Sequence, residues 1–421
     1  MAIPVSVLAV LPPPSSVRFD WATVQPFFHA DNVTGPYSDE AIRSIARFPV
    51  VTFEKWHGAC SHMGRGGRCP SIDKDVYPCC EENRIIADLQ RVKAISPNTT
   101  TVMYFNMVLD FPQYELHQQM LANPHWALAL PNGSRCMMSG DSGPATKHPG
   151  GHPGMIGGME IFDFSQPAVV DAFVAACVNP VQAGRADGCF LDRAISCVPT
   201  SPCALSESGC LMCPYLSKER KKAWDDGHAA VISRIQQGIG TDRLLIANHA
   251  TSLATANGAQ LENFFQGHNG GVAGIRALLE CTANAKLCEA HFTIGSDCRN
   301  ITNPLAAFLI GAGRQAYFGC GPWHVHDNTG KLAVGKWHKC FEKKLGAPVG
   351  RVKVTGHEVG CNASWMDPHA PFSVRSAKNC SFERAFASGT VVKFDGATNT
   401  GSIKWAGDAP DVDPKHSCDT T

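Results

Sequence analysis

Short β-rich runs alternate with longer helical patterns along most of the chain, and this alternation constrains the fold more than any other feature. Each run ends in polar or charged residues and is usually followed by a helical pattern, which is typical of βα units and a parallel sheet. Eight runs are predicted as strands: Val50–Trp56, Thr100–Val108, Met159–Phe164, Gly188–Asp192, Leu244–Asn248, Ala259–Phe264, Leu287–Phe292 and Gln315–Phe318. Eight strands are what a closed (β/α)8 TIM barrel needs, and an open doubly wound sheet is the structural alternative.

Helical patterns lie between most of these strands. The predicted helices cover Glu81–Ile95, Pro167–Val181, Lys218–Gly238 and Pro304–Gly313. Ser165 can cap the second of them, and Pro167 suits its first turn. The third is a long amphipathic stretch that ends at Gly238 or Gly240.

Changes of pattern divide the chain into four parts. Residues 1–45 are predicted as an N-terminal extension, 46–345 as the α/β barrel, 346–410 as a small C-terminal β-rich module and 411–421 as an irregular tail. A length of 421 residues suits one barrel with an appendage. Three insertions, at 58–78, 131–158 and 197–214, follow strand ends, where barrels carry functional loops.

Cysteine usage indicates an oxidising compartment. The chain has 19 cysteines, including the cluster Cys197, Cys203, Cys210 and Cys213, for which disulfides are favoured over structural zinc. Six N-x-[ST] sequons predict N-linked glycans at Asn32, Asn98, Asn132, Asn300, Asn362 and Asn379. We therefore expect a secreted glycoprotein, although residues 1–14 make a poor signal peptide as written.

Charge and hydropathy exclude two classes of partner. Lys and Arg total 37, as do Asp and Glu, so no basic excess exists to bind nucleic acid. No run approaches the 18 apolar residues of a membrane span.

Carboxylates stand at the ends of six predicted strands, where barrels place catalytic groups. They are Glu54, Asp110, Asp163, Asp192, Glu262 and Glu289. Asp192 is the sharpest candidate, because a short buried strand in ADGCFLDRA delivers it to the rim. The alternative is that Asp192 pairs with Arg193 or caps the next segment.

Glu262, Glu289 and Glu54 compete to partner Asp192, and each has a structural alternative as a satisfied rim residue. Strand alternation points Glu54 and Lys55 to opposite sides. Two acids suit glycosidic cleavage, because one stabilises or attacks the anomeric carbon while the other protonates the leaving oxygen. Trp56 and Trp323 could cover sugar faces, and Tyr104, Asn106, Asn248 and His249 could bind hydroxyls.

At this point a family resemblance emerges. VTFEKW, YFNMVLDFP, FDFSQP, DGCFLDRA, LLIANHA and LENFFQ resemble, in this order, the strands of glycoside-hydrolase-like (β/α)8 families related to the α-galactosidase clan and to polygalactosaminidase-type barrels. The resemblance spans roughly residues 48–345, and RAFASGTVVKFDG resembles the β-sandwich end of such proteins. In the clan, an acid ending strand four is the nucleophile, and the acid/base ends strand six.

The resemblance implies a secreted glycosidase that cleaves an oligo- or polysaccharide, with Asp192 as nucleophile and Glu262 as proton donor. At strand six the clan has Asp where this chain has Glu. The expected substrate-binding residues are Glu54, Trp56, Tyr104, Asn106, Asp163, Arg193, Asn248, Glu289 and Trp323. We expect no cofactor and no metal.

Two other function classes stay open. One class is a zinc enzyme, because His324-x-His326 has ligand-like spacing and His291 lies in the seventh predicted strand. The barrel could also be a non-catalytic carbohydrate-binding or extracellular structural protein, which needs only an aromatic platform. A lyase or a sugar isomerase is a smaller alternative, since both use acids at the rim.

Overall fold

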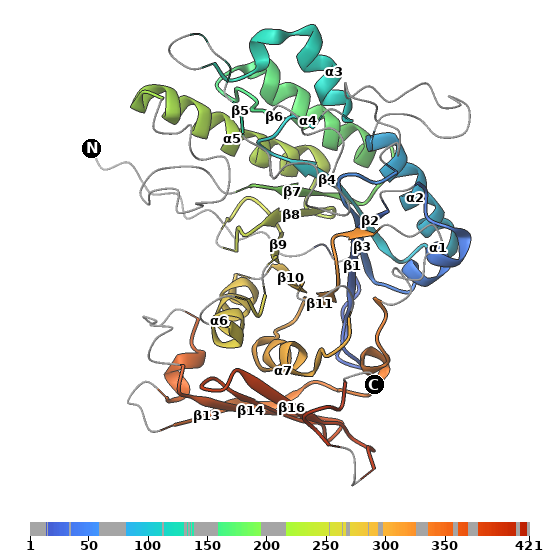
Figure 1. Cartoon of the computed structure of the whole chain (residues 1–421), viewed down its shortest axis with the longest axis vertical. Helices are drawn as coiled ribbons and strands as arrows, with labels where there is room; N and C mark the ends of the chain where they lie inside the picture. Colours follow the sequence, from blue (N-terminus) through green and yellow to red (C-terminus); the bar gives the residue numbers. More distant parts are fainter. Residues whose placement is uncertain are drawn as a thin grey trace, which may run out of the picture.

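Eight parallel strands form one nearly closed barrel sheet, in a computed structural model of the chain (Figure 1). The structure describes residues 14, 16–32, 35–58, 81–111, 113–129, 133, 135, 137–138, 159–194, 216–251, 253–262, 264–266, 270–284, 286–293, 298–325, 336–356, 361–368, 378–409 and 413–418. The barrel strands, in spatial order, are β1 (Phe27–His29), β3 (Val50–Phe53), β4 (Thr100–Asn106), β7 (Gly188–Asp192), β8 (Leu244–Asn248), β9 (Gly258–Leu261), β10 (Leu287–Phe292) and β11 (Ala316–Cys320). A parallel bridge between Pro26 and Phe318 brings the first and last strands together. The prediction of a (β/α)8 barrel with a C-terminal β module is confirmed.

Two strand predictions are wrong. The first barrel strand is β1, which lies within the segment expected as an extension and pairs with β3 from Phe27 to His29. The predicted strand Met159–Phe164 is not in the barrel. Only β6 (Met159–Glu160) forms there, and it pairs antiparallel with β5 (Met137–Met138). A second small pair joins β2 (Asp31–Asn32) to β12 (His324–Val325).

Helices connect the barrel strands. They are α1 (Asp39–Ile45), α2 (Glu81–Ile95), α3 (Glu115–Ala122), α4 (Pro167–Gln182), α5 (Lys218–Ile239), α6 (Gly270–Ala283) and α7 (Thr302–Gly311), with single 3-10 turns at Pro124–Trp126, Lys339–Glu342 and Ala363–Met366. Pro167 opens α4 as expected, but Ser165 does not cap it, because its hydroxyl donates to Asp163 instead. Gly240 ends α5 with a φ of 82°, a conformation that favours glycine.

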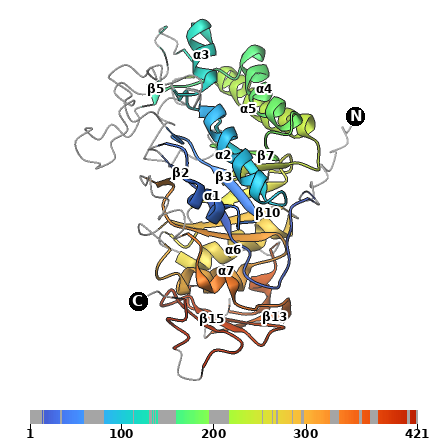
Figure 2. The same cartoon turned by 90° about the vertical axis from the view of Figure 1, so that its right-hand side faces the viewer.

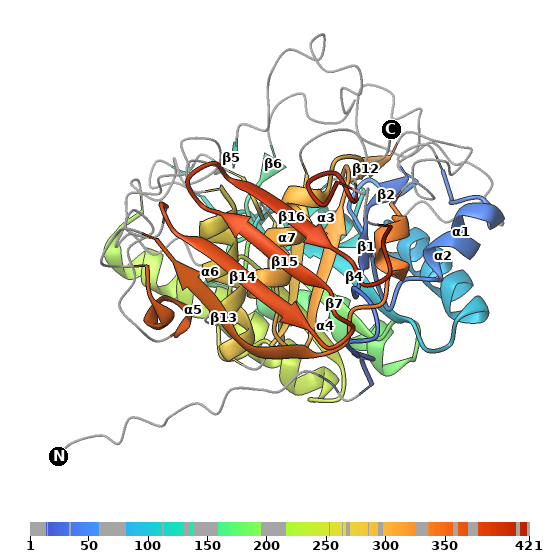
Figure 3. The same ribbon diagram turned by 90° about the horizontal axis from the view of Figure 1, so that it is seen from below.

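A four-stranded antiparallel sheet follows the barrel. Its strands are β13 (Pro348–Thr355), β14 (Ser381–Phe386), β15 (Val391–Asp395) and β16 (Thr400–Lys404), in that order. Figure 3 shows them side by side beneath α6 and α7, and Figure 2 shows this sheet at the opposite end of the molecule from α3. Phe382, Phe394 and Ile403 are buried in the cluster that the sheet forms with the two helices.

Arg384 joins this sheet to the barrel. Its half-buried guanidinium donates to the carbonyls of Leu309, Ile310 and Ala312 at 2.9, 3.0 and 2.6 Å, which are orphan acceptors at the end of α7. Burial lowers the pKa of Arg384 to about 10, so the side chain stays charged at neutral pH. The module is therefore held by a charged cap as well as by apolar packing.

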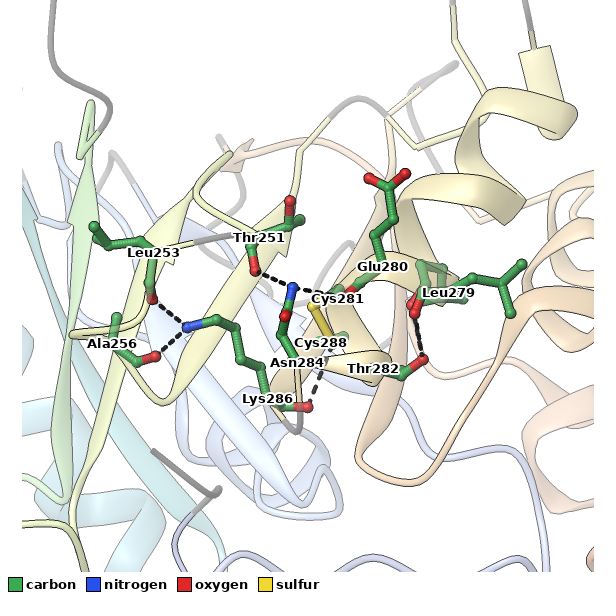
Figure 4. The surroundings of a disulfide bond; sticks show 11 residues. Thr251, Leu253, Ala256, Leu279, Glu280, Cys281, Thr282, Asn284, Lys286 and Cys288 are labelled. Carbon is green, nitrogen blue, oxygen red and sulfur yellow. Dashed lines mark hydrogen bonds between the residues drawn. A yellow bond between two sulfur atoms is a disulfide. The ribbon is translucent and has the colours of Figure 1, made fainter. Parts of the chain in front are cut away.

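Five disulfides link described residues: Cys177–Cys189, Cys281–Cys288, Cys298–Cys320, Cys340–Cys418 and Cys361–Cys380. The first two tie α4 and α6 to the strands that follow them. Figure 4 shows the second, beside which the Lys286 ammonium donates to the carbonyls of Leu253 and Ala256. The cluster Cys197, Cys203, Cys210 and Cys213 lies outside the described residues.

Two further expectations concern membrane spans and N-linked glycans. No helix among the described residues is long and apolar enough to cross a membrane. Among the sequons, Asn98, Asn300, Asn362 and Asn379 are exposed, and Asn132 lies outside the described part. Asn32 is buried, and its Nδ2 donates to the Pro36 carbonyl at 3.3 Å.

Candidate active site

Asp192 is the last residue of β7, and its neighbours on both sides donate hydrogen bonds to it. From β4, the Tyr104 hydroxyl and the Asn106 amide reach Oδ2 at 2.7 and 3.1 Å. From β8, Asn248 Nδ2 reaches Oδ1 at 2.9 Å, and the backbone N–H of Arg193 reaches the same oxygen at 2.8 Å. Because all four groups donate, the arrangement suits an ionised carboxylate.

Gly188 allows β7 to lie close enough for these contacts. A Cβ at this position would sit 1.9 Å from the carbonyl oxygen of Leu244, so a larger residue would force β8 away. The register then places Asn106 beside Asp192. The guanidinium of Arg193 makes no ion pair with Asp192 in the described part of the chain, so the alternative of a locked Asp–Arg pair is not observed.

Glu262 follows β9 and shares a donor with Asp192. The same Asn248 Nδ2 that bonds to Asp192 lies 2.7 Å from Glu262 Oε2. Because both bonds start at one nitrogen, Asp192 Oδ1 and Glu262 Oε2 lie no more than about 5.6 Å apart, in the range of paired glycosidase carboxyls. The side chain of Glu262 is 33% exposed, so a ligand can reach it. One amide thus holds two acids together at the barrel rim.

His249, the next residue after β8, also contacts Glu262. Its Nε2 lies 3.0 Å from Glu262 Oε2, and its side chain is 41% exposed. Burial raises the pKa of Glu262, but the hydrogen bonds from His249 and Asn248 and the charges of His249 and Lys55 outweigh burial and lower it. Glu262 is therefore ionised in the unliganded protein at neutral pH.

Glu54 and Lys55 both belong to this cluster, which corrects the expectation that they point to opposite sides. Lys55 Nζ donates to Glu54 Oε2 at 2.8 Å and lies 4.7 Å from the Tyr104 ring centre. Strand β3 ends at Phe53, so its alternation does not extend to either residue. Burial disfavours the ammonium, but Glu54, Asp192 and Glu262 outweigh this and raise the pKa of Lys55.

His57 fixes the turn that carries Glu54 and Lys55 through buried hydrogen bonds. Its Nδ1 accepts from the Asn32 backbone at 3.2 Å, so Nε2 carries the proton that it shares with Asp88 at 2.9 Å. Arg84 also donates to the His57 carbonyl at 2.9 Å. Since His57 and Asp88 are both buried, this network fixes the position of the cation beside the acids.

Backbone strain gathers at the same rim. Trp56, Arg193, His249 and Phe265 have φ values of 72°, 55°, 56° and 70°. Each lies just beyond the end of a barrel strand. Positive φ is costly for such residues and persists where the surrounding structure imposes it, which is common at functional sites.

Below the rim, polar side chains fill the barrel interior. Gln260 Nε2 donates to Glu289 Oε2 and contacts His29 Nδ1, both at 2.9 Å, and His29 Nε2 lies 3.4 Å from Glu54 Oε1. Burial raises the pKa of Glu289 to about 8 and lowers that of His29 despite Glu54, so both groups are neutral at pH 7. His291 is also buried, and its pKa lies well below the ordinary value for the same reason.

The remaining predicted residues lie in different places. Trp56 is 3% exposed and packs edge-on against Phe111, so its ring is not an open sugar platform. Trp323 is half-buried at the rim and stacks on His291 with ring centres 3.6 Å apart. Asp163 is not brought to the cluster, because its carboxylate accepts from Ser165 and Gln166 beyond β6.

Several residues of the site were not predicted. Lys55 was assigned to the wrong side, and His29 and Gln260 were not identified. For Gln260 the only signal was a polar residue inside an otherwise apolar strand. No group of three or more metal-ligand side chains is placed to hold a metal within the described ranges. His326 lies outside them, so the His324-x-His326 pattern is not tested.

Comparisons with known proteins give one family match and several distant likenesses among solved structures. The family model described as hypothetical glycosyl hydrolase family 15 matches residues 93–390. Similar solved structures include GH36 α-galactosidases from Geobacillus stearothermophilus (10% identity, TM-score 0.43) and Lactobacillus brevis (12%, 0.42), and a maltogenic α-amylase from Thermotoga neapolitana (10%, 0.42). They cover 88%, 89% and 92% of this chain. The chain spans 47% and 46% of the two galactosidases, about half their length, and 89% of the amylase. A search of curated proteins finds no match.

Proposed function

The chain belongs to hypothetical glycosyl hydrolase family 15, and from that membership and the paired acids we propose that it is a secreted glycosidase acting on an oligo- or polysaccharide. The observation that carries the proposal is the single Asn248 amide that donates to both Asp192 and Glu262. A carbohydrate-binding barrel would need no second acid at that distance. The five disulfides support an extracellular location.

In the proposed mechanism Asp192 is the nucleophile. Its four donors fix the carboxylate in orientation, and Asn106 is itself fixed because its Oδ1 accepts from the Val108 and Leu109 backbones at 3.0 and 2.8 Å. Asp192 attacks the anomeric carbon while Glu262 gives a proton to the leaving oxygen, and the glycosidic electron pair leaves with that oxygen. The acting form of Glu262 is the carboxylic acid, which has taken its proton from solvent and which the lowered pKa makes the minor form at neutral pH. Water then releases the sugar, with Glu262 taking the water proton.

The spacing of the acids favours retention of anomeric configuration. Retaining enzymes hold their carboxyl groups about 5–5.5 Å apart, whereas inverting enzymes need about 6.5–9.5 Å to admit a water molecule. The bound of about 5.6 Å between Asp192 and Glu262 fits the first class. Lys55 would offset the repulsion between the two carboxylates at this distance.

The test is turnover of a panel of p-nitrophenyl glycosides and oligosaccharides by the purified chain and by Asp192→Asn. We expect the variant to lose at least roughly 10³-fold in kcat while it keeps its fold. Asp187→Asn is the matched control, because Asp187 directly precedes the first residue of the same strand and pairs with Lys93 and Arg243 far from the rim. Equal turnover by wild type and Asp192→Asn would refute the assignment.

A covalent label identifies the nucleophile and the stereochemistry. An activated 2-fluoro glycoside of the preferred sugar should trap a glycosyl-enzyme, and peptide mass mapping should find the adduct on Asp192. Proton NMR of the first product should show the anomer of the substrate. Initial release of the opposite anomer would exclude the double-displacement route.

A further inference from the structure

Arg193, the residue after Asp192, has a backbone that is fixed on both sides. Its N–H donates to Asp192 Oδ1 at 2.8 Å, and its carbonyl accepts from His228 Nε2 at 3.1 Å. Burial lowers the pKa of His228 to about 4, so the imidazole is neutral at pH 7 and its Nε2 carries the proton that this bond needs. The imidazole stacks on Trp224, whose Nε1 donates to the Phe162 carbonyl at 2.8 Å. Helix α5, which carries His228 and Trp224, therefore holds the main chain of Arg193 in place.

The guanidinium of Arg193, by contrast, has no hydrogen bond or ion pair within the described part of the chain. The side chain is half-buried, and its Nε is buried without any partner. An exposed arginine needs no partner, because water solvates it, whereas a buried charged donor without a partner is costly. The φ of 55° adds strain, which persists where the surrounding structure imposes it. The fold thus maintains an unpaired cation at the rim, next to the proposed nucleophile.

The acids of the site do not neutralise this guanidinium. Asp192 takes its side-chain hydrogen bonds from uncharged donors, although a guanidinium belongs to the next residue. Glu54 is paired with Lys55 at 2.8 Å, and Glu262 Oε2 lies 3.0 Å from His249 Nε2. Each acid therefore has its own partners, and the guanidinium stays available to a ligand.

We infer that Arg193 is a specificity-determining residue that binds an anionic substituent of the substrate, either the carboxylate of a uronic acid or a sulfate ester. The inference rests on the proposed function and narrows its substrate class to an acidic oligo- or polysaccharide. The planar guanidinium offers paired N–H donors whose spacing matches two oxygens of an oxyanion.

The position of Arg193 suits a substituent of the sugar that Asp192 attacks. Its N–H lies on Asp192 Oδ1, and the N–Cα bond adds about 1.5 Å, so the Cα of Arg193 lies within about 4.3 Å of that oxygen. A sugar whose anomeric carbon meets Asp192 is therefore within reach of the guanidinium. A neutral sugar at the rim would take water from the guanidinium without supplying a counter-charge, which is costly. A site of this kind rejects an analogue that lacks the charged group, because its own buried donors are then left unpaired.

The kinetic test compares pairs of p-nitrophenyl glycosides that share one ring and differ in one charge. The pairs are glucoside with glucuronide, galactoside with galacturonide, and galactoside with its 6-sulfate, each as both anomers. We expect the acidic member to have a kcat/KM roughly 10- to 100-fold above that of its neutral partner. Arg193→Gln should remove this preference, whereas a merely structural role would lower kcat/KM for both members by the same factor. Arg193→Lys should restore only part of the preference, because an ammonium keeps the charge but not the paired donors.

Arg243→Gln is the matched control. Arg243 directly precedes β8 and pairs with Asp187 at 3.1 Å, at the opposite end of the strand from the rim, so this variant should keep the preference. Preference for the uronides alone identifies a carboxylate as the ligand of Arg193. Preference for the sulfated member alone identifies a sulfate ester.

A second measurement needs no turnover. Isothermal titration calorimetry follows the same glycosides as they bind to Asp192→Asn and to the double variant that also carries Arg193→Gln. We expect tighter binding of the acidic member, weaker binding of it as the NaCl concentration rises, and loss of both effects in the double variant.

The outcomes separate this inference from the proposed function. Equal or weaker use of the acidic member in every pair, or a preference that Arg193→Gln leaves unchanged, overturns the inference even if neutral glycosides are cleaved. A salt-dependent preference that requires Arg193, in a chain that cleaves none of these glycosides, sinks only the proposed function. Absence of both binding and turnover across all pairs counts against both.

Discussion

Substitution of Asn248 by alanine tests the arrangement of the acids directly. Asn248 is buried, and its Nδ2 donates to two ionised acceptors, each bond being worth about 1.5–3 kcal/mol. If one such bond persists in the transition state, Asn248→Ala raises the barrier by about 3 kcal/mol, or roughly 10²-fold in kcat/KM. The pKa of Glu262 should also rise, because one of the hydrogen bonds that lower it is lost.

The stability of the same variant should fall. The substitution removes two hydrogen bonds to carboxylates, each worth about 1.5–3 kcal/mol, but it also removes Asn248 Oδ1, which is buried without a hydrogen-bond partner at a cost of about 1–3 kcal/mol. We therefore expect the free energy of unfolding, measured in urea, to fall by about 2–3 kcal/mol.

Asn257 provides a matched control. It is equally buried, its Oδ1 accepts from Leu245 N and its Nδ2 donates to Arg243 O, both at 2.8 Å, but it lies at the amino ends of the strands. Asn257→Ala should cost about 2–4 kcal/mol of stability, since it orphans two backbone groups, and leave kcat/KM unchanged. A twofold or smaller loss of kcat/KM in Asn248→Ala, or an equal loss in Asn257→Ala, would refute the reasoning.

Three further predictions concern stability. Burial raises the pKa of Glu289 from 4.5 to about 8, so the folded state holds the proton of this carboxyl more tightly than the unfolded state does. The free energy of unfolding should therefore fall as pH rises from about 4.5 to about 8. In urea titrations at several pH values, Glu289→Gln should flatten this slope. Arg384→Met should lower stability by about 2–4 kcal/mol by uncapping α7, whereas Met at the exposed Arg351 should have no such effect. Reduction should lower the melting temperature markedly, at about 2–5 kcal/mol per native disulfide, and an unshifted curve would contradict the bonded structure.

The alternation of strands and helices was enough to predict the barrel, because consecutive parallel strands need a crossover that a helix supplies. It was not enough to find β1. Phe27–His29 is too short to show a pattern, and only its pairing with Val50–Thr52 makes it a strand. The opposite error arose at Met159–Phe164, whose composition suits a strand but whose backbone pairs antiparallel with β5 and, through single bridges at Ile161 and Phe162, with Leu109 and Ala127 rather than with a barrel strand.

The site was partly predictable for a similar reason. An acid after a buried strand can be read from the sequence, and Asp192 and Glu262 were predicted as site residues in this way. Lys55 was misplaced because alternation holds only while the backbone stays extended, and the strand ends at Phe53. His29 and Gln260 could not be assigned, since their contact joins residues 231 positions apart.

The two strand errors leave the numbering of the later barrel strands, which carry Asp192 and Glu262, unchanged. The missing β1 and the surplus strand at Met159–Phe164 both precede β7, so Asp192 ends the fourth strand of the observed barrel and Glu262 follows the sixth. Between them lies β8, the fifth strand, and its last residue is Asn248. In a parallel barrel the residue that ends a strand faces the ends of its two neighbours. An amide at the end of strand five is thus the one terminal side chain that can donate to acids on strands four and six together. The spacing of the acids therefore follows from the order of the strands, and a change at Asn248 should disturb both acids at once.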